Sequence, residues 1–146
     1  MSTNAPRRWW LLVPLALVVL SSCSSEPDPP PGPSPEAVQR VADLVRDAAT
    51  AAGDSPTVGS GGDAHQTTSV RLGGVPADGG TRAAWVACTG GSDLDAQLAG
   101  AAITVDCDGQ AHRVEGLVPD GDTVVFEITR PSDVDSVWAL TMTSAV

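Results

Sequence analysis

The chain has 146 residues, which is room for one domain. It carries 18 acidic residues against eight arginines and no lysine, which gives a formal net charge of −10 at pH 7. This acidity argues against nucleic-acid binding and against docking to anionic lipid, because both need exposed basic residues. A solvated surface is the simplest interpretation of the charge, and an affinity for cations or basic partners is the alternative.

The chain begins with a polar segment that contains two arginines, followed by an unbroken apolar run at residues 9–20. As a helix this run would rise about 18 Å against a hydrocarbon core of about 30 Å, and Pro14 interrupts it. Such a pattern is typical of an export signal, so we expect residues 1–22 to be cleaved off. The general secretory route is favoured, although Arg7-Arg8 weakly resembles a twin-arginine signal.

The apolar run is followed directly by Leu20-Ser21-Ser22-Cys23. An aliphatic residue, two small residues and a cysteine at this place resemble the lipobox of bacterial lipoproteins. The resemblance implies that the Cys23 sulfur carries a diacylglyceryl group and that Cys23 becomes the first residue of the mature protein. Two acyl chains would anchor the protein stably to the outer face of the cell membrane. The alternative is an ordinary secreted protein with Cys23 in a disulfide.

A Pro-rich segment comes next. Residues 24–35 contain six prolines and no aliphatic residue, so they cannot bury a core. Polyproline II rises about 3.1 Å per residue, so this segment could reach roughly 35 Å. We expect residues 23–35 to form a lipidated, semi-rigid stalk and residues 36–146 to form the globular domain. A Pro-rich ligand for a partner domain is the alternative.

The globular part opens with a helix signal. Ser34-Pro35-Glu36 combines a capping oxygen, a proline in the first turn and an early acid. Valines and alanines then recur at helical spacing until Gly53. The pattern predicts an amphipathic helix at 36–52 whose apolar face docks on the domain. Binding to a partner helix or to a membrane surface is the alternative.

After the helix the sequence turns to β structure. Residues 53–66 are rich in glycine and predict a flexible loop. Apolar residues then alternate with period 2 between close turn signals, which is typical of a β-sandwich or small barrel. We expect a mainly β fold, a six- to seven-stranded antiparallel β-sandwich with one N-terminal amphipathic helix. The predicted strands are 67–75, 82–89, 101–107, 110–115, 122–130 and 136–143.

One predicted hairpin can be placed in detail. Asp108-Gly109 is a favoured two-residue turn, which would make Cys107 face Gln110. Residues opposite each other share a face of the sheet. The inward face would hold Ile103, Val105, Cys107 and Val114, and His112 would take inward parity. The outward face would hold Thr104, Asp106, Arg113 and Glu115.

Cys88 and Cys107 each lie near a strand end, at positions that are expected to point inward. This placement predicts a disulfide between them. Outside the cytoplasm such a pair should be oxidised. The closed loop of about 20 residues would contribute roughly 3 kcal/mol to the free energy of unfolding. This pairing leaves Cys23 available for lipid.

Trp85 lies at the opposite parity to Cys88. Either a bulge intervenes or the ring points from the outer face of the sheet. In the second case the helix at 36–52 would cover it. A sugar-stacking platform is the functional alternative.

The histidines show no catalytic arrangement. His65 lies in the predicted loop near Asp63, and His112 lies beside the predicted disulfide. An ordinary solvated or structural role is favoured for each over a metal ligand or a catalytic base. There is no Gly-x-Ser-x-Gly nucleophile motif, and no Cys/His set has zinc spacing once the two cysteines pair. We expect no enzymatic activity and no cofactor.

Alternate acids give the best candidate site. The three pairs are Asp93 and Asp95, Asp106 and Asp108, and Asp120 and Asp122. Carboxylates that share a face of a strand, together with turn carbonyls, are ligands for calcium. Because aspartates also form turns through their own hydrogen bonds, turn formation is the favoured interpretation and calcium the weaker one.

Together these patterns predict a membrane-anchored extracytoplasmic lipoprotein whose domain is a binding or interaction module of unknown ligand. The membrane contact would be made through lipid on Cys23, and a protein or envelope partner remains unidentified. The alternative is a structural or accessory cell-envelope protein without a discrete ligand. An enzyme would require a pocket that joins His112 or His65 to an acid cluster.

Overall fold

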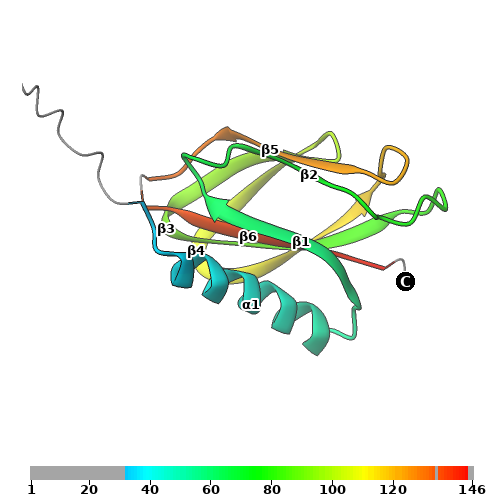
Figure 1. Cartoon of the computed structure of the whole chain (residues 1–146), viewed down its shortest axis with the longest axis horizontal. Coiled ribbons are helices and arrows are strands. Elements are labelled where there is room, and N and C mark those ends of the chain that lie inside the picture. The colour runs from blue at the N-terminus through cyan, green and yellow to red at the C-terminus, as the bar shows by residue number, and fades with distance from the viewer. Residues whose placement is uncertain (1–31, 134, 145–146) are drawn as a thin grey trace, which may run out of the picture. The chain divides into compact units, whose positions relative to one another are not determined.

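A computed structural model describes residues 32–133 and 135–144. The predictions for the signal at 1–22, for Cys23 and for most of the Pro-rich segment lie outside these residues. One helix and six strands make up the fold, which confirms the mainly β prediction (Figure 1). Within the described ranges, no helix is long and apolar enough to cross a membrane. The elements are α1 (Pro35–Ala51), β1 (Pro56–Asp63), β2 (Ser69–Leu72), β3 (Arg82–Leu98), β4 (Ala101–Leu117), β5 (Val124–Arg130) and β6 (Val137–Thr143).

The helix forms where the sequence predicts it. The Ser34 hydroxyl accepts a hydrogen bond of 3.3 Å from the Ala37 N–H and caps the first turn. Val41, Val45 and Ala49 are buried, and the first two lie in an apolar cluster with residues of β3 and β6. The expectation that the apolar face docks on the domain is therefore confirmed.

All strand pairs are antiparallel and belong to one hydrogen-bonded sheet. Its order is β1-β6-β3-β5-β2, and β4 pairs with β3. β6 pairs with residues 84–89 of β3, whereas β5 pairs with residues 95–98. The rings of Phe126 on β5 and Trp138 on β6 lie 4.5 Å apart although these strands do not pair. The sheet therefore doubles over into a nearly closed, barrel-like shape with an apolar interior (Figure 1).

The predicted hairpin at Asp108-Gly109 is wrong. Residues 101–107 and 110–115 are two parts of β4 and pair with β3, not with each other. The actual turn is Ala99-Gly100, where both residues have positive φ and Leu98 faces Ala101. Gly109 instead has φ 78° at a register shift inside β4. Asp-Gly provides the left-handed backbone that either a bulge or a turn needs, so the motif alone does not distinguish them.

The predicted faces of β4 nevertheless hold. Val105 and Cys107 are buried, while Arg113 and Glu115 are exposed. A bulge inserts one extra residue into the strand, so odd-numbered residues point inward before it and even-numbered residues point inward after it. A two-residue turn would cause the same change. The alternation was therefore predicted correctly from an incorrect connection.

The predicted loop at 53–66 is also wrong, because it contains β1. This strand pairs with β6 in regular register from Gly59 to Asp63. A Cβ atom at Gly59 would lie 2.8 Å from the Leu140 carbonyl oxygen. One at Gly61 would lie 2.9 Å from the Trp138 carbonyl oxygen and 3.3 Å from Val38 of α1. These glycines permit close approach of neighbouring chain, as isolated strand glycines often do.

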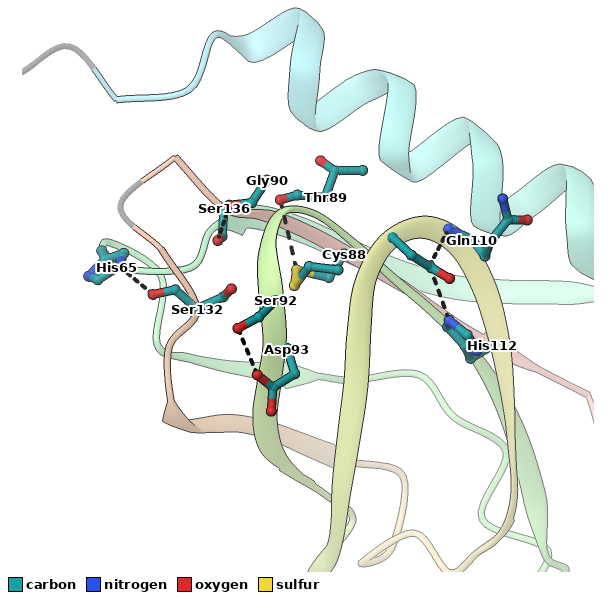
Figure 2. The surroundings of a disulfide bond; sticks show 12 residues. His65, Cys88, Thr89, Gly90, Ser92, Asp93, Gln110, His112, Ser132 and Ser136 are labelled. Carbon is teal, nitrogen blue, oxygen red and sulfur yellow. Dashed lines mark hydrogen bonds and ion pairs between the residues drawn. A yellow bond between two sulfur atoms is a disulfide. The ribbon is translucent and has the colours of Figure 1, made fainter.

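The predicted disulfide between Cys88 and Cys107 is present. Its cysteines lie within the long strands β3 and β4, not at strand ends as expected. The β3–β4 register shifts between Thr89 and Asp93, where Gly90 has φ 84°. The disulfide therefore joins the two strands beside the bend at which the sheet doubles over (Figure 2).

Candidate functional site

A groove of about 550 Å³ runs between α1 and β1 and is the candidate functional site. α1 contributes Val38, Gln39 and Ala42 to one wall. β1 contributes residues 56–61, and β6 adds Leu140 and Thr141. The volume lies within the range of about 300–1,000 Å³ that is usual for ligand sites. We call this feature the α1–β1 groove.

The depth of the α1–β1 groove depends on glycines. The face of β1 that bears Gly61 points towards α1, because a Cβ atom there would meet Val38. Gly59 lies two residues earlier and therefore shares that face. With no side chains at these two positions, backbone is exposed between the helix and the sheet.

The helix wall of the groove is polar and internally paired. The Asp43 Oδ1 atom accepts hydrogen bonds of 2.8 Å from Gln39 Nε2 and 2.8 Å from Arg46 Nη1. The Thr50 hydroxyl donates to the Arg46 carbonyl oxygen at 2.9 Å. The charge of Arg46 is thus balanced by Asp43 within the wall.

β1 also lies at the end of the strand order. Among the described residues, it pairs only with β6. A strand at the end of a sheet presents backbone N–H and C=O groups that another chain can pair with. The groove therefore combines an open volume with an unpaired strand edge.

A buried carboxylate fixes the end of α1 on the sheet. Asp54 follows the helix, and its Oδ2 atom accepts hydrogen bonds from Trp85 Nε1 at 2.8 Å and Arg113 Nε at 2.9 Å. The Asp54 side chain is only 7% exposed. The hydrogen bond from Arg113, followed by that from Trp85, lowers the pKa of Asp54. Arg113 also forms an ion pair with Glu115.

Trp85 lies on the outer face and packs with the cluster beneath α1, as the helix-covered prediction requires. Its ring is half-buried and its N–H is bound to Asp54. The sugar-stacking alternative therefore receives no support from this arrangement.

The acids at Asp93 and Asp95 lie within β3, not in a turn as expected. Arg130 binds both, through Nη2 to Asp93 Oδ2 at 2.7 Å and through Nε to Asp95 Oδ2 at 2.7 Å. A hydrogen bond from Ser92, then Arg130, lowers the pKa of Asp93, while Arg130, then Thr104, lowers the pKa of Asp95. A guanidinium thus holds the carboxylate oxygens that calcium would need.

The other acid pairs form local hydrogen bonds. Asp106 is exposed opposite Asp93, and Asp108 accepts a 2.8 Å hydrogen bond from the Gln110 N–H, which lowers its pKa. Asp122 accepts a 3.1 Å bond from the Thr123 hydroxyl, and Asp120 forms a bridge with Thr123. Over residues 32–133 and 135–144, no three His, Cys, Asp or Glu side chains could together hold a metal ion.

The two histidines lie on opposite sides of the disulfide region (Figure 2). His65 is exposed, with Nε2 3.1 Å from the Ser132 carbonyl oxygen, and its backbone N–H donates to Asp63. His112 lies on β4 with a 40% exposed side chain, and its Nε2 is 3.5 Å from Asp108 Oδ1. Neither histidine lines the α1–β1 groove.

Sequence reasoning missed both β1 and the role of Asp54. The partners of Asp54 are 31 and 59 residues away along the chain, so no local motif marks it. Comparison with known protein families, with curated proteins and with solved structures finds no match for this chain. The site is therefore interpreted from its own geometry.

Proposed function

We propose that this chain is an exported, lipid-anchored protein whose β domain is an interaction module, with the α1–β1 groove as its binding surface. The lipobox-like Leu20-Ser21-Ser22-Cys23 supports the anchor. The Cys88–Cys107 disulfide supports a location outside the cytoplasm, because structural disulfides persist in oxidising compartments.

The α1–β1 groove is the observation that carries the binding role. Its walls are held by independent contacts: Asp54 fixes the end of the helix, and the regular pairing with β6 fixes β1. Groups that are already in place lose little conformational freedom on binding, which favours affinity. A preformed groove lined by both apolar and polar residues is what a binding module needs.

Site-specific photocrosslinking in intact cells of the native host tests this function. We would place a photoreactive amino acid at Gln39 in the groove wall or at Gln97, an exposed control position on β3. We expect a discrete adduct from position 39 and none from position 97. If the two positions give the same adducts, or neither gives any, the groove is not a binding surface and the accessory role without a discrete ligand is favoured.

A further inference from the structure

We propose that the α1–β1 groove takes an extended, positively charged polypeptide segment, which adds to the free edge of β1 as a further strand. This inference rests on the proposed function of the groove and names the chemistry of its ligand. Strand addition gives affinity through backbone hydrogen bonds and specificity through alternate side chains.

Three strands end the pairing network, and they differ in how well their edges are protected. β4 bears four charged residues and bends at its bulge, which are common protections against edge pairing. β2 has only four residues and includes Arg71. β1 bears no charge from Pro56 to Gly62 and keeps regular register with β6 from Gly59. Among the described strands, β1 therefore has the edge least protected by charge over residues 56–62, and the strand across the remaining gap in the sheet is β2. The charged residues of β4 are Asp106, Asp108, Arg113 and Glu115.

The groove beside β1 offers space for a further strand. An added strand lies about 4.8 Å from its neighbour and needs room for its alternate side chains. Beside β1 the α1–β1 groove supplies about 550 Å³, and Gly59 and Gly61 put no side chain into it. Side chains of the incoming strand on the helix side can thus enter the groove beside Gln39 and Thr50.

The domain carries an excess of negative charge. The described residues include sixteen acids and six arginines. Four of those arginines already form ion pairs with acids of the domain. The net negative charge of the domain attracts a basic segment and repels a second copy of this acidic chain, while the groove lining itself carries Arg46, paired with Asp43, and no acid. Charge thus favours a basic partner over self-association through β1.

The test uses the full chain in detergent and a labelled short peptide of alternating threonine and lysine. Binding would be followed by fluorescence anisotropy and by amide hydrogen exchange. We expect binding that protects those amides of residues 59–62 that do not already bond to β6. A threonine–glutamate peptide should not bind. A threonine–lysine peptide N-methylated at alternate residues, on the edge that faces β1, should also fail, because it cannot form the backbone hydrogen bonds.

Charge variants locate the site. Gln39→Arg should weaken binding of the threonine–lysine peptide about fivefold and Gln39→Glu should strengthen it, since rim charges act by attraction or repulsion. Gln97→Arg adds the same charge at an exposed position outside the groove and is the matched control. Both positions are exposed, so these variants should keep the fold.

Several outcomes would overturn the proposal. The N-methylated peptide could bind as well as the unmethylated peptide, or the peptide could protect the amides of β2 or β4 instead of those of β1. Gln39→Arg and Gln97→Arg could weaken binding equally, or the protein could dimerise through β1. Absence of binding to the threonine–lysine peptide also overturns it. If position 39 still crosslinks a partner in cells, the binding function stands and only the ligand class fails. If position 39 crosslinks nothing, the function itself fails.

Discussion

The indole N–H of Trp85 donates a 2.8 Å hydrogen bond to the carboxylate of Asp54, which joins the outer face of β3 to the segment that follows α1. Arg113 of β4 binds the same carboxylate. One nearly buried acid thus receives donors from two strands at the end of the helix. Because α1 forms one wall of the groove, this contact also holds the candidate site in shape.

Asp54→Ala should lower the melting temperature by several degrees, because it leaves the Trp85 N–H and the Arg113 guanidinium without their acceptor. Thermal denaturation followed by circular dichroism measures the change. Asp47→Ala removes an exposed acid from α1 and is the matched control. Equal melting temperatures for the two variants would show that the Asp54 contact does not secure the helix.

The same contact predicts a pH dependence. The pKa of Asp54 is lower in the folded state than in the unfolded chain, so its ionised form stabilises the fold above the unfolded value. This contribution is lost as pH falls below about 4 and through the folded pKa. Asp54→Asn cannot ionise, so its melting temperature should fall less than that of the wild type between neutral and acidic pH. Parallel pH profiles would contradict this assignment.

The residues that sequence reasoning placed correctly are those whose surroundings are local. Ser34 and the spaced valines mark α1 because capping and helical periodicity act within a few turns. The inward face of β4 follows from alternation together with the change of parity at Asp108-Gly109. These features do not depend on which strand lies alongside.

The features that were missed depend on distant neighbours. In the sequence, Gly59 and Gly61 indicate a loop. Only the close packing of β6 and α1 shows that a strand at this place has no room for a Cβ atom at either position. Ala99 has φ 50° in the true hairpin turn, a conformation that alanine rarely adopts, so the sequence points to Asp108-Gly109 instead. Asp54 is one acid in a short connection until the fold brings Trp85 and Arg113 to it.

Replacing both Cys88 and Cys107 by serine should lower the free energy of unfolding by roughly 3 kcal/mol, since the loop between them spans 19 positions. Urea denaturation of the oxidised wild type and the double variant measures the difference. Wild-type protein denatured with reductant is the control and should behave like the variant. Equal midpoints in all three samples would mean that the disulfide does not stabilise the domain.

The ion pairs of Arg130 with Asp93 and Asp95 predict that the domain does not respond to calcium. Arg130 binds Asp93 and Asp95 together, so millimolar calcium should leave the melting temperature of the wild type unchanged. Arg130→Gln should itself lower stability only slightly, because the guanidinium is 57% exposed and exposed ion pairs contribute about 0–1 kcal/mol. A calcium-dependent rise in the wild-type melting temperature would contradict the view that Asp93 and Asp95 are held by their ion pairs with Arg130.

The lipid anchor is tested most directly by mass spectrometry of the full chain expressed in a bacterial host. We expect a mature protein that begins at Cys23, carries a diacylglyceryl group on that sulfur and contains the Cys88–Cys107 disulfide. Cys23→Ala should leave the chain unprocessed or release it from the membrane, with the same disulfide intact. A wild-type protein that retains residues 1–22 without lipid, or one with Cys23 in a disulfide, would contradict the proposal.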